Sequence, residues 1–288
     1  SSIGQREDRS LATAEAAEEI NAGLKIMDFE YYNPDTQKTE KLTTAVWYPT
    51  YEIPTTYIYH QTQDFISQVA YESSLAEGGP YSMVFFVHGG YASGYDCAYY
   101  AEYLASYGYI VVAPDFIDVD IGVNGEDIVT GNPAAFSRIG QQQPTTFIEL
   151  EKVKNALVNI LNISPEQFLR YLDVHRLKQT SFVIDKILEV SRESTHPFIK
   201  EDAIGLMGHS MGGSTTLGKI GPHDGQYDNR IKAAGLLAPN PEPFISSFDP
   251  LVTSLDQIQT PIIFMMGEND QMSFAGLGNT PRRIAYDQ

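Results

Sequence analysis

One short glycine-rich stretch constrains the fold of this chain more than any other, the sequence GHSMG at residues 208–212. The apolar run at 203–207 is typical of a buried strand, and the small residues at 213–220 are typical of a helix packed on a sheet. In that setting the G-x-S-x-G pattern predicts a serine on a sharp turn between strand and helix. The flanking glycines are needed because bulk there would keep strand and helix apart. We predict that Ser210 is a nucleophile; the alternative is a serine in an ordinary glycine-rich turn.

A second strand followed by glycines lies earlier in the chain. The continuous apolar run at 81–87 is what a central parallel strand covered on both faces would show. The sequence HGGY follows at 88–91, then a predicted helix at about 97–107 and another buried strand at 109–114. Strand, helix and strand in this order make a βαβ unit, which implies a parallel sheet.

The remaining segments complete the outline of an α/β protein. An antiparallel hairpin at the sheet edge is predicted from strands 24–32 and 41–48, with later strands at 231–239 and 261–267. Apolar spacing predicts helices at 64–76, 147–161, 165–172 and 177–192. We therefore predict one doubly wound, mostly parallel domain over 1–288, with an N-terminal arm at 1–22 and a cap or lid inserted at about 117–175.

The composition excludes some partners. A formal net charge of −18 would repel nucleic acid and anionic membranes and disfavours strongly anionic substrates, and we interpret it as a means of solubility. No apolar run reaches the roughly 18 residues of a membrane span. The acidic loop at 118–127 is interpreted as solvated, because its ligand order does not match a calcium-binding EF-hand. We expect neither a metal nor a cofactor.

The cellular compartment is weakly marked in the sequence. Cys97 is the only cysteine, so no intramolecular disulfide can form. The sequence begins Ser-Ser-Ile-Gly, which fits a removed signal peptide or a trimmed chain. Together with few lysines and many Tyr, Gln, Asn and Thr, this start favours a secreted or periplasmic bacterial protein.

A nucleophilic serine needs a histidine base, an acid that orients the base, and two backbone N–H donors for the oxyanion. In a doubly wound sheet these groups meet at the carboxyl ends of the strands. The amide of Met211 is the expected first donor. The second is expected from the turn at 88–91, with Tyr91 favoured and Gly90 as the fallback.

The candidate acid follows the last predicted strand. Asp270 lies three residues after the run at 261–267 and is our choice, although an exposed loop carboxylate would give the same pattern. Glu268 is the alternative acid.

These motifs in this order resemble the α/β-hydrolase superfamily. The branch they resemble holds bacterial cutinases, polyester hydrolases, dienelactone-hydrolase-like esterases and platelet-activating-factor acetylhydrolases, and the likeness covers about residues 40–115 and 176–275. It implies Ser210 as nucleophile, Asp270 as acid, and Met211 and Tyr91 as oxyanion donors. It also implies cleavage of small to medium uncharged esters through an acyl-enzyme, with lipid, aryl and polymeric polyester substrates left open.

Several further residues are predicted to lie at the substrate. Gly90, Tyr95 and His209 are assigned to the binding site, although His209 ordinarily packs under the turn in this superfamily. Tyr99 and Tyr100 are also candidates for lining an apolar acyl pocket with Tyr91 and Tyr95, unless they are helix core.

The catalytic histidine is where this sequence departs from the resemblance. In the superfamily it follows the strand after the acid, whereas this sequence stops at Gln288. No histidine has that position: we expect a structural role for His88 and a surface location for the four at positions 60, 175, 196 and 223. We therefore expect the last strand, the histidine and a final helix to be supplied by a C-terminal fragment or a second chain. The alternative is a non-catalytic binding protein that kept the fold.

Overall fold

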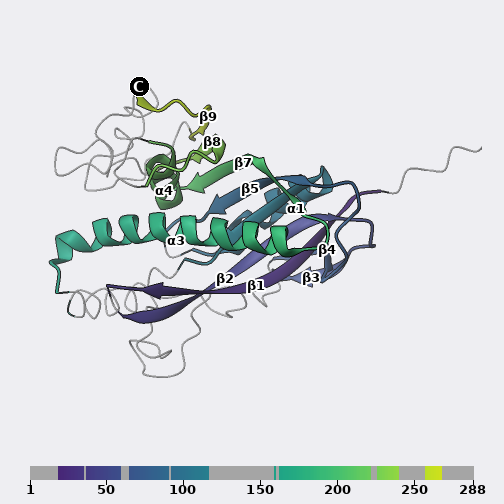
Figure 1. Cartoon of the computed structure of the whole chain (residues 1–288), viewed down its shortest axis with the longest axis horizontal. Coiled ribbons are helices and arrows are strands. Elements are labelled where there is room, and N and C mark those ends of the chain that lie inside the picture. The colour runs from purple at the N-terminus through teal and green to yellow at the C-terminus, as the bar shows by residue number, and fades with distance from the viewer. Residues whose placement is uncertain are drawn as a thin grey trace, which may run out of the picture.

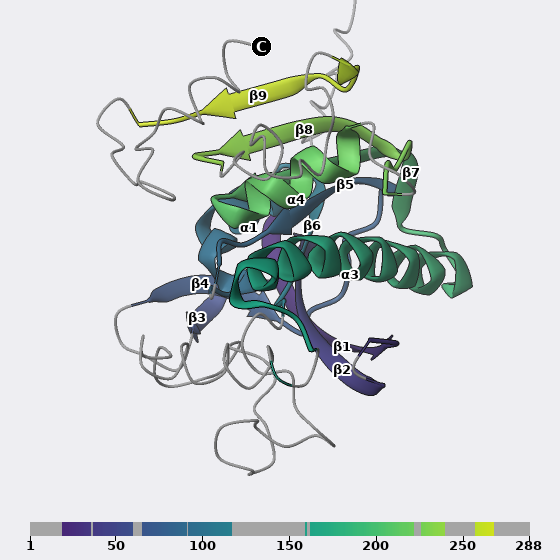
Figure 2. The ribbon, with the colours of Figure 1, turned by 90° about the vertical axis from the view of Figure 1, so that its left-hand side faces the viewer.

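In the computed structural model, the described residues are 19–35, 37–59, 65–90, 92–116, 159, 162–221, 226–239 and 257–267. They form a nine-stranded sheet in the order β3-β4-β1-β2-β6-β5-β7-β8-β9 (Figures 1 and 2). The strands are β1 (Asn21–Asn33), β2 (Lys38–Thr50), β3 (Thr55–Ile58), β4 (Ile66–Tyr71), β5 (Tyr81–Val87), β6 (Tyr109–Pro114), β7 (Ile199–His209), β8 (Ile231–Leu237) and β9 (Ile262–Met265). The helices are η2 (Gly94–Cys97), α1 (Ala98–Ser106), α3 (Pro165–Glu193) and α4 (Met211–Ile220). Among the described residues, no helix combines the length and apolar content needed to cross a membrane.

The chain changes direction across the sheet at β5. From β5 it crosses to β6 on one side, and it then returns through α3 to β7 on the other side, with both pairings parallel. The strands β8 and β9 continue the parallel part beyond β7. Because the connections leave β5 and β7 in opposite directions, a crevice opens at their carboxyl ends, where α/β proteins place their sites.

The sheet is covered on both faces, as its continuous apolar strands predict. Phe85 and Val87 pack with the apolar stripe of α3, whereas Phe86 belongs to the other cluster, together with the alanines of α1. Figure 2 shows α3 and α4 on the same side of the sheet. The predicted doubly wound, mostly parallel architecture is therefore confirmed.

Two predicted helices are one continuous helix. The segments expected at 165–172 and 177–192 join in α3, whose first turn is closed by a capping box. The Ser164 hydroxyl accepts from the amide of Gln167, and the Gln167 side chain accepts from the amide of Ser164. Residues 165–175, which we assigned to the cap, form the first part of α3, and 117–158 lie outside the described residues. Residues 1–18 of the expected N-terminal arm also lie outside them.

The predicted helix at 64–76 is wrong, and so is the edge position of the first hairpin. Residues 66–71 form β4, which pairs antiparallel with β3 and parallel with β1. Val69 and Tyr59 are thereby buried in the cluster beneath α1. Pairing to an available strand edge overrides the local helical spacing, because β structure depends on neighbours more than on propensity. As a result, the hairpin of β1 and β2 lies inside the sheet.

Candidate active site

Ser210 occupies a strained turn between β7 and α4. Its φ of 53° and ψ of −116° lie in a region that residues with side chains rarely adopt. The turn is held from both sides, because the Ser210 amide donates to the carbonyl of Leu237 at 3.0 Å and its carbonyl accepts from Gly213 at 2.9 Å. The hydroxyl makes no capping hydrogen bond to α4. The side chain is therefore not used to cap the helix that it precedes.

The two glycines around Ser210 are required by backbone contact. A Cβ on Gly208 would overlap the carbonyl oxygen of Gly212 and lie 2.6 Å from the Thr216 hydroxyl. A Cβ on Gly212 would overlap the carbonyl oxygen of Val87. The steric reason predicted for the pattern is thus confirmed, and the start of α4 is brought against the end of β5.

The turn after β5 lies beside Ser210. The Cβ position of Gly89 is 3.5 Å from Cβ of Ser210, and that of Gly90 is 3.5 Å from the Met211 sulfur. Met211 begins α4, where unpaired amides concentrate positive potential. The structure therefore brings together Ser210, Met211 and Gly90. Tyr91, Asp270 and Glu268 lie outside the described residues.

A buried arginine that sequence reasoning missed lies behind this turn. Arg176 of α3 is only 1% exposed and donates to the carbonyl of His88 at 2.6 Å and to that of Gly89 at 3.0 Å. Its guanidinium also lies over the ring of Phe116, 5.0 Å from the centroid. A sequence signal existed, because Arg176 shares the helical stripe of residues 180, 183 and 187, which all face the core.

His88 is part of the same structural unit, as expected. Its Nε2 accepts from the amide of Phe116 at 2.9 Å, which leaves the ring proton on Nδ1. Nδ1 lies 2.6 Å from the carbonyl oxygen of Gly89. Both ring nitrogens of His88 are therefore engaged with the backbone.

The surface prediction for His175 is wrong. His175 is 2% exposed, its Nε2 lies 2.8 Å from a Glu40 oxygen, and its ring stacks on Tyr171. Glu40 also accepts from Gln179 and Asn33, so α3 is bound to the β1–β2 hairpin by a buried polar cluster. A sequence-local argument cannot find a partner 135 residues away.

The predictions for the remaining histidines have different outcomes. His196 is exposed, as predicted, and His60 and His223 lie outside the described residues. His209, which ordinarily packs under the turn in the superfamily, is exposed here and lines a pocket. His209 therefore lies at the pocket, and its role in substrate binding stays a prediction.

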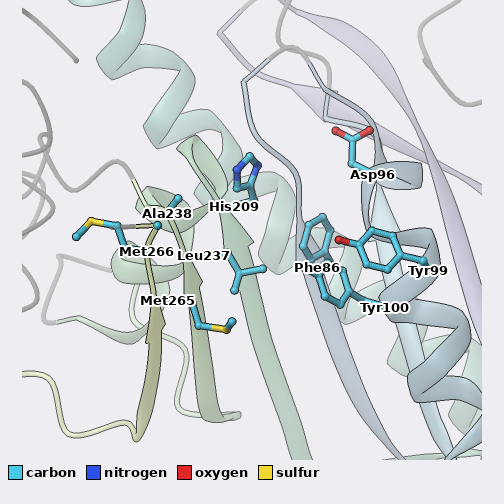
Figure 3. A pocket seen from close by; sticks show the side chains of 10 residues that line it. Phe86, Asp96, Tyr99, Tyr100, His209, Leu237, Ala238, Met265 and Met266 are labelled. Atoms are coloured by element: carbon cyan, nitrogen blue, oxygen red, sulfur yellow. The ribbon is translucent and has the colours of Figure 1, made fainter. Parts of the chain in front are cut away.

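A pocket of about 490 Å³ opens beside the Ser210 turn. In Figure 3, Tyr99 and Tyr100 of α1 face Leu237 and Met265 across it. Its lining residues come from the carboxyl ends of β5, β7, β8 and β9 and from η2 and α1: Phe86, Asp96, Tyr99, Tyr100, His209, Leu237, Ala238, Met265, Met266 and Gly267. The pocket is thus mainly apolar and aromatic, with Asp96 and His209 as its ionisable groups.

The tyrosines of this region have separate roles. Tyr99 is 58% exposed at the pocket, and its hydrogen bond with Tyr100, followed by burial, raises the pKa of its phenol. Tyr95, in contrast, is 2% exposed, and its hydroxyl is 2.8 Å from that of Tyr57 in the core. The assignment of Tyr95 to the substrate site is therefore corrected, because η2 turns this side chain inward beneath α1.

Two buried groups near the site are structural. Asp115 accepts from the amide of Gly94 and from the Ser93 hydroxyl, and so fixes the start of η2. Burial raises the pKa of the Cys97 thiol well above its ordinary value, and the thiol donates to the carbonyl of Gly94. A thiol in this state is a poor nucleophile.

The sheet order, the helices on both faces and the strained serine between a strand and a helix define the class: the chain has the α/β-hydrolase fold. A solved structure of a ferulic acid esterase from Streptomyces cinnamoneus aligns with 96% of this chain and 73% of its own, at 16% identity and a TM-score of 0.58. A CE1 ferulic acid esterase from Anaeromyces mucronatus covers 96% and 81% of the two chains, at 17% identity and a TM-score of 0.44. A dienelactone hydrolase-like promiscuous phosphotriesterase from metagenomic libraries covers 92% and 77%, at 10% identity and a TM-score of 0.44. No protein-family model and no curated protein sequence matches this chain.

Proposed function

We propose that this protein is a serine hydrolase that cleaves carboxylic esters, with Ser210 as its nucleophile. The observation that carries the proposal is the strained Ser210 backbone, held at the end of β7 with the Gly89–Gly90 turn directly beside it. Strain of this kind persists only where the surrounding structure enforces it, and it clusters at functional sites.

The proposed reaction proceeds through an acyl-enzyme. Ser210 Oγ attacks the ester carbonyl carbon, its proton passes to a base, and the carbonyl π electrons move to the oxygen. Amides of Met211 and of the turn after β5 stabilise that oxyanion. The C–O bond to the alcohol then breaks, and the alcohol leaves with the proton. Water cleaves the acyl-serine by the same steps, releasing the acid and restoring the serine.

The composition of the pocket supports the proposal that the substrate is an uncharged ester with an aryl or alkyl acyl group. Its walls are tyrosine, phenylalanine, leucine and methionine, and the chain has a net charge of −18. An anionic acyl group would meet Asp96 at the pocket. The named activity of the structural neighbour from Streptomyces cinnamoneus, that of a ferulic acid esterase, is consistent with an aryl ester.

The acid and the base remain the roles proposed from the sequence. We assign the acid to Asp270, with Glu268 as the alternative, and expect the base to be a histidine. Within the described part of the chain, no hydrogen bond joins a histidine to Ser210. The alternative proposed from the sequence is a binding protein with this fold and no catalytic base.

Turnover of p-nitrophenyl acetate and butyrate tests the proposal. Wild-type protein should hydrolyse both esters, Ser210→Ala should lose this activity, and an alkyl phosphonate should add to wild type but not to Ser210→Ala, as seen by intact mass. Ser194→Ala, an exposed serine at the end of α3, is the control. Unchanged turnover in Ser210→Ala would exclude the assignment. Ester binding without turnover by a complete, folded chain would favour the binding protein.

A further inference from the structure

We propose that Arg176 is a positioning residue of the oxyanion site, and this inference rests on the proposed function. Arg176 does not contact the substrate; it holds the carbonyl groups of His88 and Gly89 from behind the turn. Through them it fixes and polarises the peptide that faces Ser210.

Three donors converge on one carbonyl oxygen. The Gly89 oxygen lies 3.0 Å from Arg176 Nη2, 2.6 Å from His88 Nδ1 and 3.3 Å from the Ala92 amide. One of these donors carries a full positive charge, and hydrogen bonds to charged groups are the stronger kind. A carbonyl oxygen has two lone pairs, so these donors engage it fully.

The Gly89 carbonyl belongs to the same peptide unit as the amide of Gly90. In a trans peptide the C=O and N–H bonds point in opposite directions. A carbonyl drawn toward Arg176 therefore orients the Gly90 N–H away from α3. Because hydrogen-bonded groups polarise one another, donors on the oxygen also make that N–H a stronger donor. This geometry favours Gly90, the fallback of the sequence prediction, as the second oxyanion donor.

The location of Arg176 makes the contact rigid. Its guanidinium is buried against Phe116, whose amide in turn holds His88 Nε2. The planar fork of arginine can reach two carbonyls at once, which a lysine ammonium on a flexible stem does less well. The preorganised donors of an oxyanion site need such fixed supports, because their advantage comes from not reorganising during reaction.

The test compares Arg176→Met and Arg176→Lys with Arg192→Gln, a control at an exposed arginine of the same helix. For Arg176→Met we expect kcat for p-nitrophenyl butyrate to fall about 10- to 100-fold with KM changed less than about 3-fold, since loss of one oxyanion donor costs about 100- to 1,000-fold. Arg176→Lys should retain a higher kcat than Arg176→Met. Affinity for a trifluoromethyl ketone, whose tetrahedral adduct places an oxyanion in the same site, should fall in parallel with kcat/KM.

A second measurement is independent of turnover. Hydrogen–deuterium exchange of peptides covering 84–93 should speed up in both Arg176 variants and not in Arg192→Gln. A folded Arg176 variant with wild-type kcat and wild-type exchange at this turn would overturn the proposal. So would a loss of thermal stability with kcat and inhibitor affinity unchanged. If Arg176→Met does not fold, Arg176→Lys decides by the same criteria.

Failure of the proposed function gives a different pattern. Wild type that turns over no ester, or a Ser210→Ala variant that is as active as wild type, refutes the esterase assignment. Exchange at residues 84–93 then decides on Arg176 alone: faster exchange in the variants supports its hold on the turn, and unchanged exchange refutes it.

Discussion

Gly212 lies directly against the carbonyl oxygen of Val87, so the first turn of α4 touches the end of β5. This contact places Ser210, which precedes α4, beside the turn that follows β5. Because Gly212 has no side chain, α4 can approach the end of β5 closely. This approach brings the proposed nucleophile near the turn that carries the second proposed oxyanion donor. The proposed catalytic groups thus lie on turns that rigid strands and helices hold in place, as is common in α/β proteins.

Substituting Gly212 by alanine should destabilise the protein by about 3 kcal/mol or more, because the new methyl group meets backbone that cannot move aside. Its Cβ would also lie 2.8 Å from the carbonyl oxygen of His88. Gly205→Ala in β7 is the control, because its Cβ would meet nothing closer than 3.7 Å. Urea unfolding, followed by the fluorescence of Trp47, the only tryptophan, measures both variants. Equal stability of the two variants would show that the close contact between Gly212 and Val87 does not limit the size of the residue at position 212.

The strain at Ser210 predicts an order of stability among variants that are all inactive. Ser210→Gly should be more stable than Ser210→Ala by about 1–2 kcal/mol, because glycine relieves a backbone strain of about 1–3 kcal/mol and loses some of that gain through its freer unfolded state. The same unfolding measurement tests this difference. Because neither variant has a hydroxyl, catalysis does not enter the comparison. If the alanine variant were the more stable one, the backbone of Ser210 would not be strained.

The pocket tyrosines should affect substrate binding more than chemistry. Tyr100→Ala is expected to raise KM for p-nitrophenyl butyrate by about 2- to 10-fold with kcat nearly unchanged, since aromatic contacts contribute about 0.5–1.5 kcal/mol. Tyr103→Ala, on the same helix but outside the pocket lining, should behave like wild type. Initial rates over a range of ester concentrations measure both parameters. An equal rise in KM for the two variants would show that the acyl group does not bind in this pocket.

A charged cluster ahead of β8 predicts a loss of stability in acid. Burial alone would raise the pKa of Asp228, but hydrogen bonds from Arg230 outweigh it and hold the pKa below its ordinary value of 3.8. The Arg230 Nη2 and Nε atoms lie 2.7 and 2.9 Å from its carboxylate oxygens. Since the folded-state pKa is lowered, this contribution is present above about pH 3.8 and is lost as the pH falls through the folded-state pKa.

Asp228→Asn should therefore lower the free energy of unfolding at pH 7 by about 1.5–3 kcal/mol, the range for hydrogen bonds to charged groups. Its difference from wild type should shrink below about pH 3.8. Asp185→Asn, the exposed partner of the same Arg230, should cost much less, as surface ion pairs do. Unfolding curves at pH 7 and pH 3 compare the three proteins, and a difference that does not change with pH would contradict the lowered pKa.

Much of the fold could be predicted from the sequence because its signals were local. The apolar run of β5 and the flanked G-x-S-x-G turn each fix their own conformation through burial and glycine sterics. The helix expected at 64–76 failed because β4 is defined by its partners β1 and β3. The position of the first hairpin failed for the same reason.

The sequence by itself determined which residues stand after which strands, and so placed Ser210, Met211 and Gly90 at one edge of the sheet. Only the tertiary structure decided which side chains face that edge and which support it from behind. It put Tyr95 into the core, His175 on Glu40, and Arg176 beneath the His88–Gly89 carbonyls. These contacts join residues far apart in the chain, and their free energy comes from packing and charge pairing that no local pattern records.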